Sequence, residues 1–346
     1  MKTPALRSAP GSRFTTAVLP LVVLALLAVV PFTASAYLQD LVVRILILAI
    51  FALSLELLVG TTGLVSLGHA AFLGIGAYAT VLGAPASDPG SFFGLLALAM
   101  VSAGVYAAVT GALSLRTKGV YFIMVTLAFA QMAYFIVHDT KAGGGSDGIY
   151  LNLKPVVGPA DAPWLDPGSR TTLYVVVLVA FALVYAVLAL LLRSRFGHAL
   201  VGIRLNEQRM RAAGFPTFFY KWAAFVIAGV LAAVAGFLIA VRDGFVNPEM
   251  LAWHESGAVL LMLILGGLGH LRGAVLGAVA FTLLKEAYQS EGIVGALAGH
   301  WQLTLGLTII VLVALMPKGL IGLPDLLRRR RAPSATAATA DGDAAG

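Results

Sequence analysis

Apolar runs of about twenty residues recur along most of this chain, and they restrict its fold more than any other feature. An α-helix needs a run of that length to cross the hydrocarbon core of a bilayer. Hydrophobic residues make up 60% of the 346 positions and charged residues 11%, whereas soluble domains carry about 25% charged residues. A closed β-barrel would show shorter segments of alternating polarity. The sequence therefore predicts an all-α polytopic membrane protein.

We predict about ten transmembrane helices, at residues 17–36, 41–59, 68–84, 92–115, 120–137, 173–192, 222–241, 256–268, 274–288 and 301–316. The third, eighth and ninth are short or interrupted by glycine. We expect broken helices there, because irregular backbone at membrane depth needs protein or water around it. The spans define a transmembrane domain over residues 17–322. A cytosolic segment, residues 1–16, precedes it, and a basic and then disordered cytosolic tail, residues 323–346, follows it.

The positions of lysine and arginine predict that both termini face the cytosol, because cytosolic loops carry an excess of these residues. With the N-terminus inside, the outside loops hold only Lys141, Lys154, Arg170 and Arg242, and most of the other basic residues lie inside. The same arrangement explains the net charge of +7 without a nucleic-acid partner. Membrane lipid is the expected partner of the spans.

The N-terminus has a second interpretation. Lys2, Arg7 and Arg13 precede an apolar run that ends in Ala34-Ser35-Ala36, an order that is also typical of a cleaved secretory signal. The run is long for such a signal, so we favour a retained first span. The other spans have the same orientation in both cases.

A polar stretch between two spans, residues 193–216, is the main candidate for a functional site, and we call it the basic segment. It carries five arginines and lies on the predicted cytosolic side. Asn206 is a good N-cap, and Glu207 in the first turn suits the helix dipole. Gly214 fits the left-handed position that often follows the last residue of a helix. Pro216, two residues later, prevents the helix from continuing.

These signals predict a helix of about two turns, residues 207–213, presented at the membrane surface to a soluble partner. An ordinary basic loop that only sets the orientation of the chain is the alternative. The capped ends and the small pair Ala212 and Ala213 favour a docking element.

Small residues gather at the start of the third span, in the stretch Gly60 to Tyr78, where they permit close helix packing. Ser66 and His69 add polar groups there, and a packed, hydrogen-bonded histidine is the simpler interpretation of His69. Glu56 is the one carboxylate well inside a span away from the outer rim, and such groups are costly and often functional. Snorkelling, or a hydrogen bond to a neighbouring helix, would also explain Glu56.

A second glycine pattern lies further along the chain. Gly269, Gly273 and Gly277 are spaced by four, which predicts that they share one helix face. The stretch from Gly266 to Gly273 is expected to form a tight inside turn. It does not resemble a phosphate-binding loop, because the chain contains no Gly-Lys-Ser/Thr.

The sequence offers no catalytic domain. The longest predicted outside loop, residues 138–172, is rich in glycine and proline turns and does not resemble a folded domain. The chain has no cysteine, which excludes disulfides and thiolate metal sites. Its six histidines are scattered, and no His-Glu-x-x-His motif occurs. We therefore predict no metal site, no catalytic residue and no enzyme activity.

Several motifs, in order from about Leu41 to Leu323, resemble the permease subunits of branched-chain amino-acid ABC importers, of the LivM type. The matching stretches are residues 63–78, 144–148 in the outside loop, 195–200 through 212–214, 220–227, 256–262, 266–269 and 317–320. Glu56 departs from the family pattern, in which we would expect Asn or Asp at this position.

The resemblance implies a transmembrane subunit of the bacterial inner (plasma) membrane that moves branched-chain or related amino acids inward. A second, homologous permease would pair with it, and a periplasmic solute-binding protein would deliver the solute. Two separate ATPase subunits would bind the ATP and drive transport, so this chain would hold no cofactor of its own.

The resemblance also assigns residues. The basic segment would be the ATPase-coupling loop, and the residues expected to contribute are Arg204, Glu207, Arg209, Arg211, Ala212, Ala213 and Gly214. Arg204, Arg209 and Arg211 would pair with acidic groups of the ATPase. Polar side chains expected along the translocation path are Glu56, Ser66, His69, Thr126 and Gln131.

The substrate stays open at this point, because relatives with such motifs import leucine, isoleucine and valine, other amino acids, urea, amides or small organic acids. A self-sufficient secondary transporter or channel is the main alternative. It requires coupling-ion carboxylates near the middle of the membrane, and the sequence offers only Glu56. An intramembrane enzyme needs a constellation that the sequence lacks, and a membrane scaffold would leave the basic segment unexplained.

Overall fold

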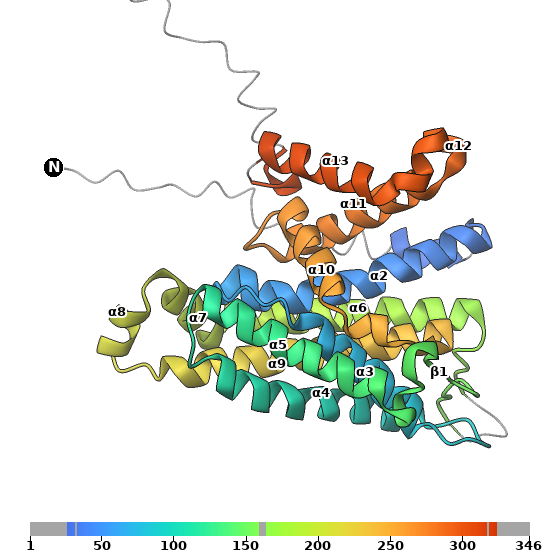
Figure 1. Ribbon diagram of the computed structural model, residues 1–346, viewed down its shortest axis with the longest axis horizontal. Coiled ribbons are helices and arrows are strands. Elements are labelled where there is room, and N and C mark those ends of the chain that lie inside the picture. Colours follow the sequence, from blue (N-terminus) through green and yellow to red (C-terminus); the bar gives the residue numbers. More distant parts are fainter. Residues whose placement is uncertain (1–25, 32, 159–163, 317, 324–346) are drawn as a thin grey trace, which may run out of the picture. The chain divides into compact units, whose positions relative to one another are not determined.

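The computed structural model describes residues 26–31, 33–158, 164–316 and 318–323 (Figure 1). Within these ranges the chain is mostly helical, and six helices are long and apolar enough to cross a membrane. A bent helix pair adds a seventh if it is counted as one span. Half of the predicted first span, the whole N-terminal segment and nearly all of the tail lie outside the described residues. The chain divides into two compact units, Met1–Gly257 and Ala258–Gly346.

The first unit contains the helices that carry most of the candidate residues. Its long helices are α2 (Ala36–Glu56), which continues into the π-helix η1 (Leu57–Thr62), α3 (His69–Gly83), α4 (Phe92–Ser114), α5 (Val120–Asp139), α6 (Arg170–Arg193) and α9 (Thr217–Asp243). Its shorter elements are η2 (Lys141–Gly143), η3 (Gly145–Asp147), β1 (Ile149–Tyr150), α7 (Arg195–Leu205), α8 (Glu207–Ala212), β2 (Phe245–Val246) and η4 (Pro248–Leu251).

The second unit contains most of α10 (Trp253–Gly266), and then α11 (Leu271–Gln289), α12 (Glu291–Val294), η5 (Gly295–His300), α13 (Trp301–Leu315) and η6 (Leu320–Gly322). The axes of α10 and α11 differ by 114° across a break of four residues. The break lies where we expected a tight turn, between Gly266 and Gly273. Because α10 has 14 residues and α11 has 19, the eighth predicted span is short and the ninth is not.

Serine residues begin several of the helices. The side chains of Ser35, Ser91, Ser169 and Ser194 each accept a backbone N–H three residues further on, at the starts of α2, α4, α6 and α7. Such caps satisfy one of the first N–H groups of a helix, which have no partner inside it. Local sequence therefore fixes where these helices begin.

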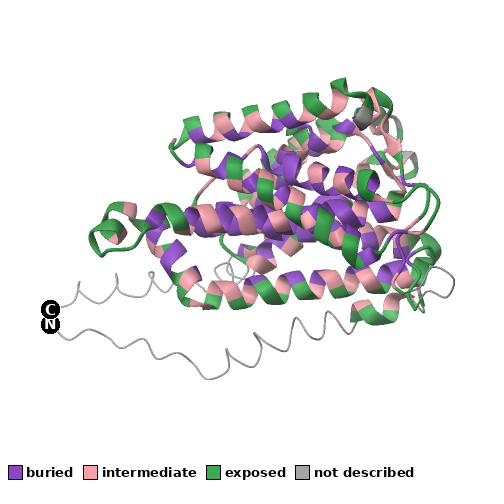
Figure 2. Ribbon diagram, turned by 90° about the horizontal axis from the view of Figure 1, so that it is seen from below, coloured by how far each residue is buried: buried purple, intermediate pink, exposed green. Residues whose placement is uncertain are grey.

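In the first unit, α2 with η1, α3 and α9 form the interior, and α4, α5 and α6 surround them. Figure 2 shows buried residues concentrated in the central helices and exposed residues on the outer faces. Within the most apolar 18-residue stretch of each span, 83% is buried in α2 with η1 and 78% in α9. The buried share is only 28% in α4 and 22% in each of α5 and α6. On α4, Val101, Val105 and Val109 are exposed at a spacing of four. That apolar face has the composition that lipid chains require.

The interior helices approach closely because glycines face one another's backbone. A Cβ atom on Gly236 of α9 would overlap the carbonyl oxygen of Leu73 in α3. A Cβ atom on Gly76 of α3 would lie 2.7 Å from the Cα atom of Ala233. Most of the small residues that the sequence gathers in α3 therefore have a packing role, as we predicted.

Two breaks interrupt the helices. Residues 63–68 separate η1 from α3, which has only 15 residues, and Gly63 has a φ of +74°. Residues 267–270 separate α10 from α11, with positive φ at Gly267 and Gly269. The prediction that Gly269 shares a helix face with Gly273 and Gly277 is therefore wrong, because α11 begins at Leu271 and Gly269 lies in the turn.

The outside loop is more ordered than its turn-rich composition suggested. Its strand β1 pairs antiparallel with β2, in the register Ile149 with Val246 and Tyr150 with Phe245. A Cβ atom on Gly148 would overlap the carbonyl oxygen of Val246, so this approach requires glycine. In Figure 1 this ribbon lies at the opposite end of the first unit from α7 and α8. That arrangement is consistent with loops on opposite sides of a membrane.

The packing of α3 against α9 gives a stability prediction. Gly236→Ala places a methyl group against a backbone oxygen, and we expect it to lower the free energy of unfolding by about 1–3 kcal/mol, as overpacking does. The readout is the Tm of the detergent-solubilised protein. Gly257→Ala is the matched control, because a Cβ atom there meets no atom within 4 Å. Equal Tm values for the two variants would contradict the packing described.

Candidate functional site

The basic segment folds into two short helices, α7 and α8, at one end of the first unit (Figure 1). The side-chain oxygen of Asn206 accepts the N–H of Arg209 at 2.9 Å, which confirms the predicted N-cap of α8. The helix ends at Ala212, one residue before the predicted end. The segment is therefore an ordered structure that its own sequence caps.

Gly214 ends α8 as predicted. Its φ is +86°, and its N–H donates to the carbonyl of Arg211 at 2.9 Å. The next N–H, from Phe215, reaches back to the carbonyl of Met210 at 3.1 Å. These two bonds form the Schellman motif, which favours glycine because a side chain strains the left-handed backbone.

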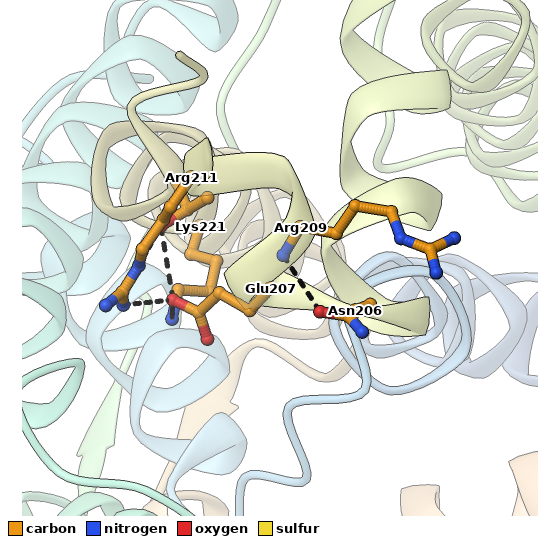
Figure 3. Close-up of polar contacts among 6 residues, drawn as sticks. Asn206, Glu207, Arg209, Arg211 and Lys221 are labelled. Carbon is orange, nitrogen blue, oxygen red and sulfur yellow. Dashed lines mark hydrogen bonds and ion pairs between the residues drawn. The ribbon is translucent and has the colours of Figure 1, made fainter. Parts of the chain in front are cut away.

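Glu207 fixes α8 to the start of α9 (Figure 3). Its Oε1 atom receives hydrogen bonds from Arg211 at 2.5 Å, from Lys221 at 2.9 Å and from Thr217 at 3.1 Å. The Lys221 side chain is only 8% exposed and that of Glu207 24%. Glu207 was expected to contact a partner, but this carboxylate is engaged inside the chain.

The charges around Glu207 shift its titration. Burial by itself raises the pKa of this carboxyl, but hydrogen bonds from Lys221 and Arg211, the charge of Lys221 and the bond from Thr217 lower it from 4.5 to about 2. Because the pKa is lower in the folded state, ionised Glu207 stabilises the folded state above about pH 4.5. That contribution is lost as the pH falls toward 2.

The remaining residues assigned to the coupling loop divide into two groups. Arg209, Ala212, Ala213 and Gly214 are exposed, and the Arg209 side chain points away from the Glu207 cluster in Figure 3. Arg204 is exposed as well, but its Nη1 atom donates a hydrogen bond to the carbonyl of the buried Gly60. Arg204 therefore also holds the segment in place.

Apolar side chains surround the exposed residues of α8. Leu205, the last residue of α7, is 81% exposed, and Phe215, shortly after α8, is 39% exposed. Phe219, in the first turn of α9, is 64% exposed. Together with Arg209 they form a mixed basic and apolar surface, which is the composition of many protein interfaces.

Two of the predicted path residues lie together. Ser66 and Thr126 line a small cavity of about 10 Å³ inside the first unit, room for about one water molecule. Three further hydroxyls that the sequence reading missed, Tyr106, Thr110 and Ser114, also line it, with Gly68, Phe72, Phe129, Ala130 and Phe225. The signal for the missed residues was present, because positions 106, 110 and 114 are spaced by four and share one face of α4.

The hydroxyls of this cavity leave acceptor capacity unused. Tyr106 and Thr126 donate to backbone carbonyls, at 2.6 Å and 2.9 Å. Thr110 donates in the same way to its own helix at 2.7 Å. The buried Ser114 hydroxyl has no hydrogen-bond partner within the described residues. The cavity can therefore offer oxygen atoms to a polar group that enters it.

The other predicted path residues lie elsewhere. His69 is fully buried, with Nε2 2.8 Å from the Ser54 hydroxyl and its ring 5.4 Å from that of Phe51. These contacts fit the packed, hydrogen-bonded histidine. The buried Nε2 of Gln131 has no hydrogen-bond partner within the described ranges. Glu56 is 1% exposed and lies against Gly60, so the snorkelling interpretation is wrong.

A repeated tripeptide marks the two helix breaks. Leu67-Gly68-His69 directly precedes the body of α3, and Leu268-Gly269-His270 directly precedes α11. Gly-Ala follows at the same distance in both, at residues 76–77 and 277–278. Glycine-interrupted spans in corresponding positions of two halves are typical of transporters that bind solute near such breaks.

No cluster of three or more metal-binding side chains occurs in the described part of the chain.

The Glu207 cluster gives a prediction about local stability. Glu207→Gln keeps the shape but removes the charge, so α8 is expected to open about ten-fold more often at pH 7, a loss of about 1.4 kcal/mol. Hydrogen exchange of the amides of residues 207–215 measures this opening. Glu249→Gln is the control, because its side chain is 61% exposed and far along the chain. Unchanged exchange in Glu207→Gln would contradict the anchoring role.

Comparison with known proteins identifies the family of this chain. A family model described as "Branched-chain amino acid transport system / permease component" matches residues 37–316. The LivM permease protein of the high-affinity branched-chain amino acid transport system of Escherichia coli is 31% identical, over 87% of this chain and 74% of that protein. LivM of Salmonella typhimurium is 30% identical, over 84% and 71%. LivH of Escherichia coli, named for the same kind of system, is 27% identical over 46% of this chain and 50% of its own length. The chain belongs to the permease components of branched-chain amino acid transport systems.

Proposed function

We propose that this chain forms one half of the transmembrane pathway of an ABC importer in the bacterial inner membrane. As a multi-pass permease component it would move branched-chain amino acids, or chemically related solutes, inward. ATP would be hydrolysed by two separate subunits, and a periplasmic binding protein would supply the solute. A second permease would complete the pathway. The similarity of the chain to both LivM and LivH supports such a partner.

One observation carries the coupling part of the proposal: α8 is exposed toward a partner and fixed to α9 at the same time. Its outer surface offers Arg209, Ala212 and Ala213. On its inner side Glu207 binds Lys221 in the first turns of α9. A subunit docked on α8 would therefore push or pull α9, one of the two most buried spans. A loop that only sets membrane orientation requires neither feature.

The hydroxyl-lined cavity is the proposed place where solute passes once the helices around it separate, because it now has room for only about one water molecule. Its lining combines hydroxyl oxygens with the aromatic rings of Phe72, Phe129 and Phe225, and no charged side chain lines it. Such a surface suits an amino acid with an apolar side chain, whose charged groups meet hydroxyls and backbone dipoles at a helix break. Ser66 and Gly68 belong to the break and to the cavity lining, so the two features coincide.

Gly214 gives the first test of the proposal. Gly214→Pro removes the N–H that bonds to Arg211 and cannot adopt a φ of +86°. We expect the complex with the ATPase and permease partners to lose ATPase co-purification and ATP-dependent leucine uptake. Gly214→Asn is the matched control, because asparagine tolerates this conformation and a Cβ atom meets open space there.

Three outcomes of that test are informative. Loss in the proline variant alone supports the coupling role of α8. An intact complex that takes up another solute but no leucine corrects the substrate only. Transport by the wild-type chain without any ATPase would overturn the proposal in favour of a self-sufficient transporter.

The cavity gives the second test. Ser114→Val removes a buried hydroxyl and fills part of the cavity, and we expect uptake at low solute concentration to fall roughly ten-fold, the effect of one hydrogen bond. Ser102→Val is the control on the same helix, because Ser102 does not line the cavity. ATPase co-purification should be unchanged in both. Equal uptake by the two variants would show that solute passes elsewhere.

A further inference from the structure

We infer that Arg204 connects the basic segment to the backbone of the innermost span, and that movement of α7 reaches the translocation pathway through this contact. The inference rests on the proposed function and deepens it, because it names the residue that passes movement from the docking surface to η1. Arg204 is a positioning residue in this account and does not contact solute.

The end of the span needs a partner that local sequence does not supply. The carbonyls in the last turn of a helix have no N–H donor inside it, and all of η1 is buried. The Leu64 N–H that follows η1 goes to the carbonyl of Leu58 at 3.1 Å, and the Thr62 hydroxyl also donates to Leu58 at 2.7 Å. The buried carbonyl of Gly60 therefore depends on a donor from elsewhere.

Arg204 supplies that donor from 144 positions further along the chain. It lies in the last turn of α7, and its Nη1 atom donates to the Gly60 carbonyl. The side chain reaches this carbonyl by passing over Gly63, where a Cβ atom would lie 3.3 Å from Cγ of Arg204. Gly63 also needs to be glycine because its φ is +74°.

A buried carboxylate lies at the same residue. A Cβ atom on Gly60 would overlap the side chain of Glu56, so this carboxylate occupies the space that glycine leaves free. The guanidinium of Arg204 and the carboxylate of Glu56 therefore both contact Gly60, one at its carbonyl and one at its Cα atom. Withdrawal of Arg204 would leave the buried Gly60 carbonyl without its donor, which is costly.

Two contacts thus join the basic segment to the interior of the unit. Glu207 joins α8 to α9, and Arg204 joins α7 to η1. These are the two most buried spans, at 78% and 83%. A π-helix is strained and often marks a functional position, so η1 is suited to change when α7 moves. The position expected to pair with an acidic group on the ATPase has an internal partner instead.

The test replaces Arg204 with glutamine in the complete complex reconstituted in liposomes, with leucine as the probe solute. Three quantities are measured: the affinity of the ATPase subunits, the rate of ATP hydrolysis and the number of leucine molecules moved per ATP. We expect Arg204→Gln to bind ATPase normally and hydrolyse ATP, but to move at least ten-fold less leucine per ATP. Arg204→Lys keeps a charged donor and is expected to restore much of that ratio.

Two further variants complete the design. Gly63→Ala disturbs the path of the Arg204 side chain without touching its charge, and we expect it to lower the leucine-to-ATP ratio as Arg204→Gln does. Arg116→Gln removes one charge from an exposed position outside the basic segment and should leave all three quantities unchanged. Both variants keep the inference testable if Arg204→Gln does not fold.

The outcomes separate the inference from the proposed function. A normal leucine-to-ATP ratio in Arg204→Gln or in Gly63→Ala would overturn the inference. Loss of ATPase binding in Arg204→Gln, with a normal ratio in the complexes that still form, would make Arg204 a docking residue and also overturn it. If the wild-type chain itself bound no ATPase, the proposed function would fail.

Discussion

Every backbone N–H and C=O group inside a bilayer must find its partner in the protein, because hydrocarbon offers none. Regular helices meet this requirement along most of the chain, but the break at residues 63–68 does not. Side chains from distant positions meet it there: Arg204 bonds to the Gly60 carbonyl before the break, and the Ser256 hydroxyl accepts the N–H of Ala70 at 2.8 Å after it. The break therefore depends on the segments that carry these two residues.

This dependence explains why the basic segment is ordered. A loop that served only to set orientation would need positive charge but no fixed structure. The segment is capped by Asn206 and Gly214, and it is held to α9 by Glu207. Its contacts to η1 and α9 reach the interior helices directly, past the peripheral ones. The proposed importer, in which separate subunits hydrolyse ATP, would need such a connection.

Features that depend on neighbouring residues could be predicted from the sequence. Asn206, Gly214 and the short third span follow from capping and helix-breaking rules, and the structure confirms them. Contacts between distant positions could not be predicted. The sequence gives no sign that Glu207 meets Lys221 or that Arg204 reaches Gly60, because a positive charge in a loop fits an internal and an external partner equally well. The hydroxyls of α4 were partly predictable. The spacing of Tyr106, Thr110 and Ser114 places them on one face of a helix, but the sequence does not show that this face lines a cavity.

The most direct test of the account is a pair of distances measured by pulsed EPR in the assembled complex. The chain has no cysteine, so spin labels can be placed by single substitutions. One pair joins Gln208 of α8 to Phe219 of α9, and the other joins Gln208 to Tyr121 of α5; all three side chains are exposed. We predict that ATP binding leaves the first distance unchanged and shifts the second by several ångströms, because α8 and α9 move together. A change in the first distance would show that the basic segment moves without α9, and it would contradict the account.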